Sequence, residues 1–253
     1  MKKLKHSILI LTTVMCSCKE QIQSTINQEN LPIDCFSQAE RYKPTYDLTR
    51  FEAEVSYLEK VDILNGNTNV KNSIIFYGSS SFAFWNADIP NDFKGLPAIG
   101  HGFGGSTFPE LIYYKQRLLI NYKPKTILIY CENDLVNPPT KSVEEVFVDA
   151  CYLINDLHSL LPDTKIFILP LKHSPARRSL IPKYDKINNL LKASVVGKKY
   201  LSFIDINPAM YKSDQKTLDG SIFRSDSLHM NRTGYERWIS IIKPILEADY
   251  KSR

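Results

Sequence analysis

From about residue 72, short apolar segments alternate with longer stretches in which apolar residues recur every three or four positions. The apolar segments are largely continuous, which is typical of strands that are covered on both faces of a sheet. They occur at 73–77, 96–99, 126–131, 165–169 and 201–206. We therefore expect a parallel sheet of about five strands.

The stretches between these segments have the periodicity of amphipathic helices. The clearest begins at Ser142, where Glu145 forms a candidate capping box, and continues to Leu161. Further helices are expected at 47–61, 109–120, 183–194 and 233–248. Because proline removes a helical hydrogen bond, we expect the last helix to bend or break near Pro244. Strands alternating with helices predict a three-layer α/β fold.

Residues that carry chemistry follow three of the predicted strands. A serine cluster occupies 78–81, a glycine-rich segment occupies 100–107, and Glu-Asn-Asp occupies 132–134. Asp226 and His229 stand near the carboxyl end, three residues apart, so both side chains can share one face of a turn. Ligands of open parallel sheets bind at the carboxyl ends of the strands. The sequence therefore predicts a site at this edge.

Each motif alone has a plainer interpretation. Serine clusters are usually turns, Asn133-Asp134 can cap a helix, and Asp226 with His229 can form a surface ion pair. The glycine-rich segment lacks the Lys-Ser/Thr ending of a P-loop and the spacing of a dinucleotide-binding motif. Only the joint occurrence of these motifs at one sheet edge favours catalysis.

Together the motifs resemble those of the SGNH/GDSL hydrolases. The resemblance covers roughly residues 70–245 in the family's order: Ile-Ile-Phe-Tyr-Gly-Ser-Ser-Ser at 74–81, Gly-Phe-Gly-Gly-Ser-Thr at 102–107, Glu-Asn-Asp at 132–134, and Asp226-x-x-His229 before Gly234-Tyr235. The Gly-Ser-Ser-Ser form is similar to that of a subgroup. The resemblance implies a flavodoxin-like fold and a carboxylic ester hydrolase that works without metal or cofactor.

The resemblance also assigns the catalytic roles. It implies that Ser80 is the nucleophile and that Asp226 and His229 complete the triad. A serine hydroxyl needs an adjacent base, which His229 would supply while Asp226 holds its tautomer. The family commonly has Asp before the nucleophile, where this chain has Ser79, so Ser79 stays an alternative nucleophile.

The oxyanion hole implied by the resemblance consists of Ser80, Gly105 and Asn133. The family usually has glycine two positions before this asparagine, and Cys131 stands there instead. We expect this change to affect the local backbone and the aim of Asn133. It favours the alternative function, a non-catalytic glycan- or lipid-binding lipoprotein with the same fold.

The amino terminus resembles a lipoprotein export signal. Residues 1–17 combine three early lysines with an apolar run at 7–15, which is too short to span a bilayer. The following Met-Cys-Ser-Cys resembles a bacterial lipobox with lipid on Cys18. A plain signal peptide and a buried amino-terminal helix are the alternatives. We thus expect a signal at 1–17, a tether at 18–45 and a hydrolase domain at 46–253.

These features predict a protein of the cell envelope, lipid-anchored in the periplasm or outer membrane, or else secreted. Hydrophobic residues make up 43% and charged residues 23%, as is ordinary for a globular domain. The formal charge of +5 includes the lysines of the signal, which leaves too little charge to favour nucleic acid. The expected partner is a glycan or small-molecule ester, and membrane contact is through the anchor only.

The sequence does not favour a metal site, because no two histidines have ligand spacing. Cys35, Cys131 and Cys151 remain in the expected mature chain, so at most one disulfide can form among them. We expect Cys131 and Cys151 to be small core residues.

Overall fold

The computed structural model describes residues 47–137 and 140–252. The predictions for the signal at 1–17, for Cys18, for the tether at 18–45 and for Cys35 lie outside the described residues and remain predictions.

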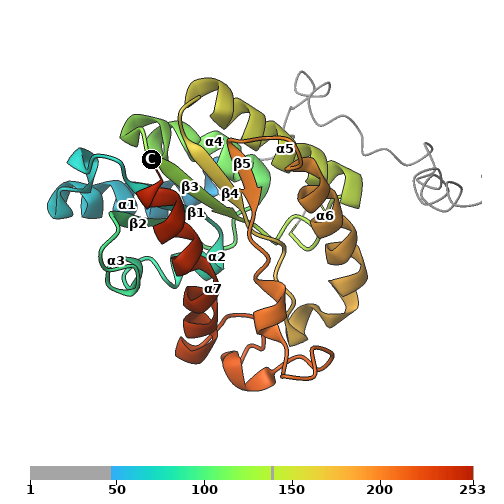
Figure 1. The fold of residues 1–253 in the computed structure, drawn as a ribbon. Helices are drawn as coiled ribbons and strands as arrows, with labels where there is room; N and C mark the ends of the chain where they lie inside the picture. Colours follow the sequence, from blue (N-terminus) through green and yellow to red (C-terminus); the bar gives the residue numbers. More distant parts are fainter. Residues whose placement is uncertain (1–46, 138–139, 253) are drawn as a thin grey trace, which may run out of the picture. The chain divides into compact units, whose positions relative to one another are not determined.

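A five-stranded parallel sheet forms the centre of the fold (Figure 1). Its strands are β1 (Ile74–Gly78), β2 (Ala98–Gly102), β3 (Thr126–Tyr130), β4 (Lys165–Ile168) and β5 (Leu201–Phe203). Each lies within or next to a predicted segment. Their order, β2-β1-β3-β4-β5, is that of flavodoxin-like folds. The predicted sheet and fold class are confirmed.

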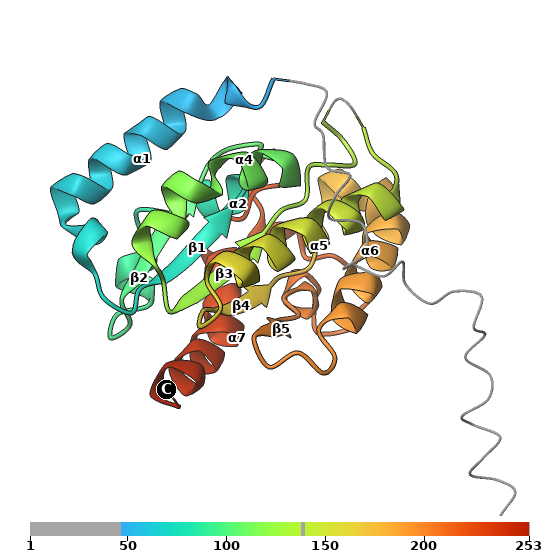
Figure 2. The same cartoon turned by 90° about the horizontal axis from the view of Figure 1, so that it is seen from above.

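Helices cover both faces of the sheet (Figure 2). One face is covered by α1 (Glu52–Asn65), α4 (Phe108–Leu118), α5 (Val143–Leu160) and α6 (Ile181–Ser194). The other is covered by α2 (Ser80–Ala83), α3 (Ile89–Asp92) and α7 (Arg232–Lys251). None of the helices in the described part of the chain is long and apolar enough to cross a bilayer.

Two local predictions can be compared directly with the helix ends. The capping box of α5 is present, because the Glu145 N–H donates to Ser142 Oγ at 3.2 Å and the Ser142 N–H donates to the Glu145 carboxylate at 2.7 Å. Of the bend or break expected at Pro244, the break is wrong, since α7 runs through this residue as one helix. The apolar face of α7, with Trp238 and Leu246, is fully buried on the sheet, and this packing outweighs the lost hydrogen bond.

The two cysteines in the core differ in state. Cys131 follows β3 and is a free, buried thiol. Cys151 on α5 is also buried but is disulfide-bonded. The expectation that both are core residues is confirmed.

The short helix α2 packs directly on the end of β2, because Gly102 has no side chain. A Cβ atom at Gly102 would overlap the backbone of Phe82 and Ala83. This close approach fixes the start of α2, and with it Ser80, above the carboxyl edge of the sheet.

Gly102→Ala should therefore lower the free energy of unfolding by about 1–3 kcal/mol, because backbone atoms must move to admit the methyl group. Urea denaturation measures the change. Gly104→Ala is the matched control, since a Cβ there would meet only Glu54 at an ordinary 3.6 Å. Equal stability of the Gly102→Ala variant and the natural protein would contradict the close-approach argument.

Candidate active site

Ser80 stands at the sharp turn between β1 and α2. β1 ends at Gly78, Ser79 caps α2, and the Ser79 hydroxyl oxygen accepts the Ser80 N–H at 2.6 Å. Tyr235 of α7 holds the turn from the other side, donating its hydroxyl to the Ser81 carbonyl at 2.8 Å. Strand and helix together present the Ser80 side chain at the carboxyl edge of the sheet.

His229 and Asp226 reach this edge on a loop that follows β5. The Ser80 Oγ lies 2.9 Å from His229 Nε2, and His229 Nδ1 lies 2.6 Å from Asp226 Oδ2. An ionised carboxylate only accepts, so Nδ1 carries the proton and Nε2 of the neutral ring accepts from the Ser80 hydroxyl. The structure thus brings the three residues into one hydrogen-bonded chain.

The backbone of the loop orients Asp226. Its Oδ1 accepts the N–H groups of Leu228 and His229, both at 2.9 Å. Burial raises the pKa of Asp226, but these hydrogen bonds and the one with His229 outweigh burial and hold it at about 2. The carboxylate is therefore ionised throughout the physiological pH range, with one oxygen on the backbone and the other on the imidazole.

Ser79 does not occupy the position of a nucleophile. It is fully buried, and its Oγ accepts from the Ser80 N–H and from Asn133 Nδ2, the latter at 2.8 Å. His229 contacts Ser80 instead. Of the two serines that the sequence left open, the geometry places Ser80 against the base.

The three expected oxyanion donors are not equally free. Asn133 Nδ2 donates to Ser79 Oγ and, at 3.1 Å, to the Ser106 carbonyl. The Ser80 N–H is also engaged by Ser79. Gly105 has a positive φ of 70°, and its carbonyl accepts from Asn137 Nδ2 at 2.7 Å. Asn133 therefore lies beside the serine turn, while no contact joins Gly105 to the triad in the described residues.

Cys131 contacts both the glycine-rich segment and the loop after β3. Its thiol donates to the Ser106 carbonyl at 3.3 Å and to Asp134 at 3.4 Å. Burial raises the pKa of the thiol well above its usual value, so it stays neutral. Asp134 also accepts the Phe108 N–H at the start of α4. The cysteine that replaces the usual glycine thus links the glycine-rich segment to the loop after β3.

Sequence reasoning missed a buried ion pair beside the triad. Lys172, after β4, lies 3.4 Å from Glu132, after β3, and both side chains are fully buried. Lys172 Nζ also donates to the Leu228 carbonyl at 2.7 Å, immediately before His229. Burial lowers the pKa of Lys172, against the opposing effect of Glu132. The lysine connects two strand ends to the histidine loop, a contact that no sequence spacing reveals.

A half-exposed aromatic ring also borders His229. Phe84 is 49% exposed, and its ring centroid lies 4.7 Å from that of His229 in an edge-on arrangement. The Arg224 guanidinium lies over the Phe84 ring, 4.4 Å from its centroid. The rim of the site on the histidine side is therefore aromatic and cationic.

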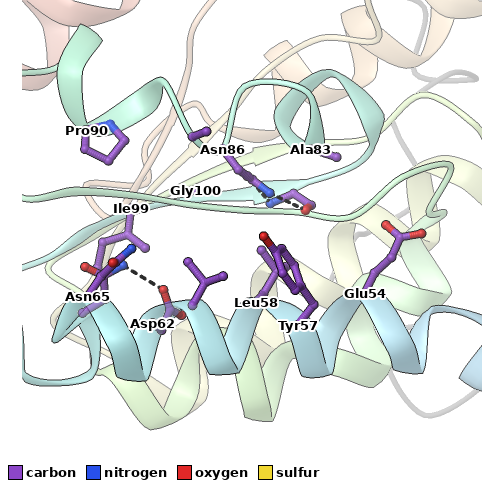
Figure 3. Close-up of a pocket in the computed structure, with 14 residues that line it drawn as sticks. Glu54, Tyr57, Leu58, Asp62, Asn65, Ala83, Asn86, Pro90, Ile99 and Gly100 are labelled. Carbon is purple, nitrogen blue, oxygen red and sulfur yellow. Dashed lines mark hydrogen bonds between the residues drawn. The ribbon is translucent and has the colours of Figure 1, made fainter.

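A groove of about 490 Å³ lies between α1 and the outer edge of β2 and contains none of the triad (Figure 3). Glu54 at one end accepts the Gly104 N–H at 2.8 Å, beside Gly105. His101 does not reach the triad, because its ring nitrogens contact the Leu118 carbonyl and Asp62. Glu54 therefore holds the glycine-rich segment through the backbone N–H of Gly104.

His173 also lies apart from the triad, in a cavity that none of the triad residues lines. His173 is held by the Tyr211 hydroxyl at 2.8 Å and lies 3.0 Å from Asp185, in a separate cavity of about 330 Å³. Within residues 47–137 and 140–252, no group of His, Cys, Asp or Glu side chains is arranged to hold a metal ion.

No protein-family model matches the chain. Among curated proteins, it is 27% identical over 161 residues to platelet-activating factor acetylhydrolase IB subunit alpha2 of Gallus gallus, covering 61% of this chain and 65% of the relative. It is 23% identical over 145 residues to the alpha1 subunit of Rattus norvegicus, covering 56% and 60%. The matches span less than two thirds of these relatives.

Solved structures match over more of the chain. A GDSL-like lipase of Bacteroides thetaiotaomicron is 19% identical with a TM-score of 0.61, covering 80% of this chain and 98% of that one. A lipase/acylhydrolase of Enterococcus faecalis is 18% identical with a TM-score of 0.54, covering 70% and 96%. A carbohydrate esterase family 3 protein of Talaromyces cellulolyticus is 13% identical with a TM-score of 0.55, covering 72% and 99%. These likenesses show a shared fold.

The Lys172 contacts can be tested with a pair of variants. Lys172→Met leaves Glu132 as an unpaired buried charge and should cost about 3–5 kcal/mol of stability. Adding Glu132→Gln removes that charge and should restore most of the stability. The Leu228 carbonyl still lacks its donor, so we expect kcat on an aryl ester to stay about ten- to a hundredfold below that of the natural protein.

Urea denaturation and steady-state kinetics on the same preparations separate the two effects. A double variant with natural stability and natural kcat would show that Lys172 holds the fold and does not position His229.

Proposed function

We propose that this chain, which has the fold of the SGNH/GDSL hydrolases, is a serine esterase that cleaves a carboxylic ester through an acyl-serine intermediate. The fold is the one that the sequence motifs predict. The observation that carries the proposal is the continuous hydrogen-bonded chain from Ser80 Oγ through His229 to Asp226.

In the first half of the reaction, Ser80 Oγ attacks the ester carbonyl while its proton passes to His229 Nε2. Asp226, ionised and fixed by the backbone, stabilises the imidazolium that forms. The negative charge moves to the carbonyl oxygen. On our proposal, the N–H groups of Ser80 and Gly105 and the Asn133 amide donate to that oxygen, each worth about 10²–10³ in rate.

In the second half, the tetrahedral intermediate collapses and the bond to the alcohol oxygen breaks. His229 gives its proton to that oxygen, so a neutral alcohol leaves and the acyl group stays on Ser80. Water then attacks the acyl-serine with the same histidine as base, releasing the carboxylic acid and restoring the hydroxyl. Every step uses groups of the protein and water.

The acyl group that we propose is small, on a carbohydrate acetyl ester or a short acyl or lipid ester. Support comes from the kind of proteins that share the fold, which include a carbohydrate esterase and a lipase/acylhydrolase. The half-exposed Phe84 beside His229 offers an apolar surface to the ester.

One observation favours the alternative, a non-catalytic glycan- or lipid-binding protein. Both N–H bonds of the Asn133 amide are directed at protein acceptors, Ser79 and the Ser106 carbonyl. An enzyme must release at least one of them to stabilise an oxyanion. The triad geometry outweighs this, because hydrogen bonds of catalytic groups commonly rearrange only when substrate binds.

A fluorophosphonate probe, which reacts with activated serines, decides between these functions. We expect labelling of the natural protein and none of Ser80→Ala, with hydrolysis of p-nitrophenyl acetate falling about 10⁴-fold or more. Ser79→Ala is the matched control and should keep its labelling, because Ser79 does not contact His229.

Absence of labelling and of ester hydrolysis in well-folded natural protein would favour the binding protein. Labelling that disappears in Ser79→Ala and persists in Ser80→Ala would move the nucleophile to Ser79.

We further propose that the protein is exported and anchored to the cell envelope by lipid on Cys18, although secretion without lipid is the alternative. Support comes from the disulfide of Cys151, because disulfides persist mainly in oxidising compartments outside the cytosol. Membrane contact through the anchor alone fits the described helices, of which none could span a bilayer.

Expression in a bacterial host with labelled palmitate tests the anchor. The full chain should incorporate palmitate and sediment with membranes, whereas Cys18→Ser should do neither and Cys16→Ser should behave like the natural chain. Unchanged incorporation in Cys18→Ser would exclude Cys18, and release of unlabelled natural protein would favour plain secretion.

A further inference from the structure

We infer that the alcohol half of the substrate carries a negatively charged group, which Arg224 binds; the inference rests on the proposed esterase function. It follows from which side of the site the alcohol must occupy and which side chains stand there.

The reaction fixes the position of the alcohol. His229 must deliver its proton to the alcohol oxygen when the intermediate collapses, so that oxygen lies next to His229 Nε2. The carbonyl oxygen points instead toward the glycine-rich segment and Asn133. The alcohol therefore extends over the histidine side of Ser80, where His229 is 17% exposed and can be reached.

Phe84 and Arg224 form the rim on that side. Phe84 follows Ser80 by one helical turn, and its N–H donates to the Ser80 carbonyl at 2.9 Å, so both residues lie on one face of this turn. Its ring contacts both the His229 ring and the Arg224 guanidinium. An alcohol leaving past His229 thus meets an aromatic ring and then a cation.

Arg224 is anchored through its Nε and its backbone N–H, while its terminal guanidinium nitrogens can contact a ligand. Its Nε donates to the Met230 carbonyl at 3.1 Å, and its backbone N–H donates to the His229 carbonyl at 2.7 Å, so the arm is tied to the histidine loop. The residue is exposed, and it makes no ion pair within the described part of the chain. The remaining guanidinium N–H groups are free to bind a ligand.

The distribution of arginine ion pairs supports a ligand role. Four described arginines pair with carboxylates: Arg50 with Glu110, Arg117 with Glu52 and Glu59, Arg232 with Asp92 and Glu236, and Arg237 with Asp219. Among the described residues, the arginines without such a pair are Arg177, Arg178 and Arg224. The first two adjoin Ala176, whose N–H donates to the Ser227 carbonyl of the same loop.

In the described part of the chain, the arginines without a carboxylate partner therefore all lie on or next to the loop that carries Asp226 and His229. Asp226 makes no ion pair with Arg224 in the described residues, and its two oxygens accept from His229 and from the loop backbone. A guanidinium binds carboxylate and phosphate through paired hydrogen bonds, and the adjacent ring favours a flat or cyclic group. The ligand class is an alcohol with a carboxylate or phosphate near the ester.

Three aryl acetates test the inference: 4-acetoxybenzoate, 4-acetoxyphenyl phosphate and the neutral methyl 4-acetoxybenzoate. We expect Arg224→Gln to lower kcat/KM about five- to tenfold for an anionic ester and to leave the neutral ester within about twofold. Arg224→Glu should lower it further for the anionic ester only. Comparing each variant with the natural protein on the same ester cancels intrinsic reactivity, and the two anions distinguish carboxylate from phosphate.

Lys251→Gln is the matched control, because it removes one exposed positive charge at the end of α7, near the start of β3 and hence at the opposite edge of the sheet. This variant should change kcat/KM by the same factor for all three esters. If Arg224→Gln lowers kcat/KM equally for the anionic and neutral esters, or for none of them, the inference is overturned. The proposed esterase function is not contradicted by that result. Failure of the natural protein to hydrolyse any of the three would overturn both proposals.

Discussion

The hydrogen bond between Ser80 and His229 joins residues 149 positions apart, and the site exists only if the fold brings them together. Ser80 is placed by β1, which lies between β2 and β3 near the middle of the sheet. His229 comes from a loop beyond β5 with no strand of its own. The loop is held instead by the bond from Lys172 to the Leu228 carbonyl and by the bond from Ala176 to the Ser227 carbonyl. The sheet therefore positions the Ser80 hydroxyl through β1, whereas side-chain and backbone contacts to its loop position His229.

The need to hold the histidine loop by side-chain contacts explains why Lys172 and Glu132 are buried beside the triad. An isolated buried charge is costly, and a buried pair is on average no more stabilising than apolar residues of similar size. The Lys172–Glu132 pair is therefore better explained by geometry than by stability, because the ammonium reaches a carbonyl that no apolar side chain could hold. The same loop carries Arg224, which makes no ion pair in the described residues.

The sequence predicts the elements whose causes are local. Continuous apolar segments indicate the five strands, and the Ser142–Glu145 pair marks the start of α5. The residues Ser80, Asp226 and His229 could be named because their motifs resemble those of the SGNH/GDSL hydrolases. The contacts of Lys172 and the stacking of Arg224 on Phe84 could not be predicted, since each depends on residues from separate loops. The uninterrupted α7 is a similar case, because tertiary packing outweighs the local effect of Pro244.

The serine at position 79 changes how Asn133 is held. Where the family commonly has a carboxylate, Asn133 here donates to a neutral hydroxyl at 2.8 Å. Hydrogen bonds to ionised acceptors are roughly twice as strong as those to neutral ones. When the Asn133 hydrogen bond moves from Ser79 to a developing oxyanion, a neutral acceptor is replaced by a charged one. This exchange is favourable in free energy. A carboxylate at position 79 would compete with the oxyanion for the same donor and repel its charge. On the proposed mechanism, the engaged Asn133 amide is thus stored close to its working position and is released by the charge that the reaction itself creates.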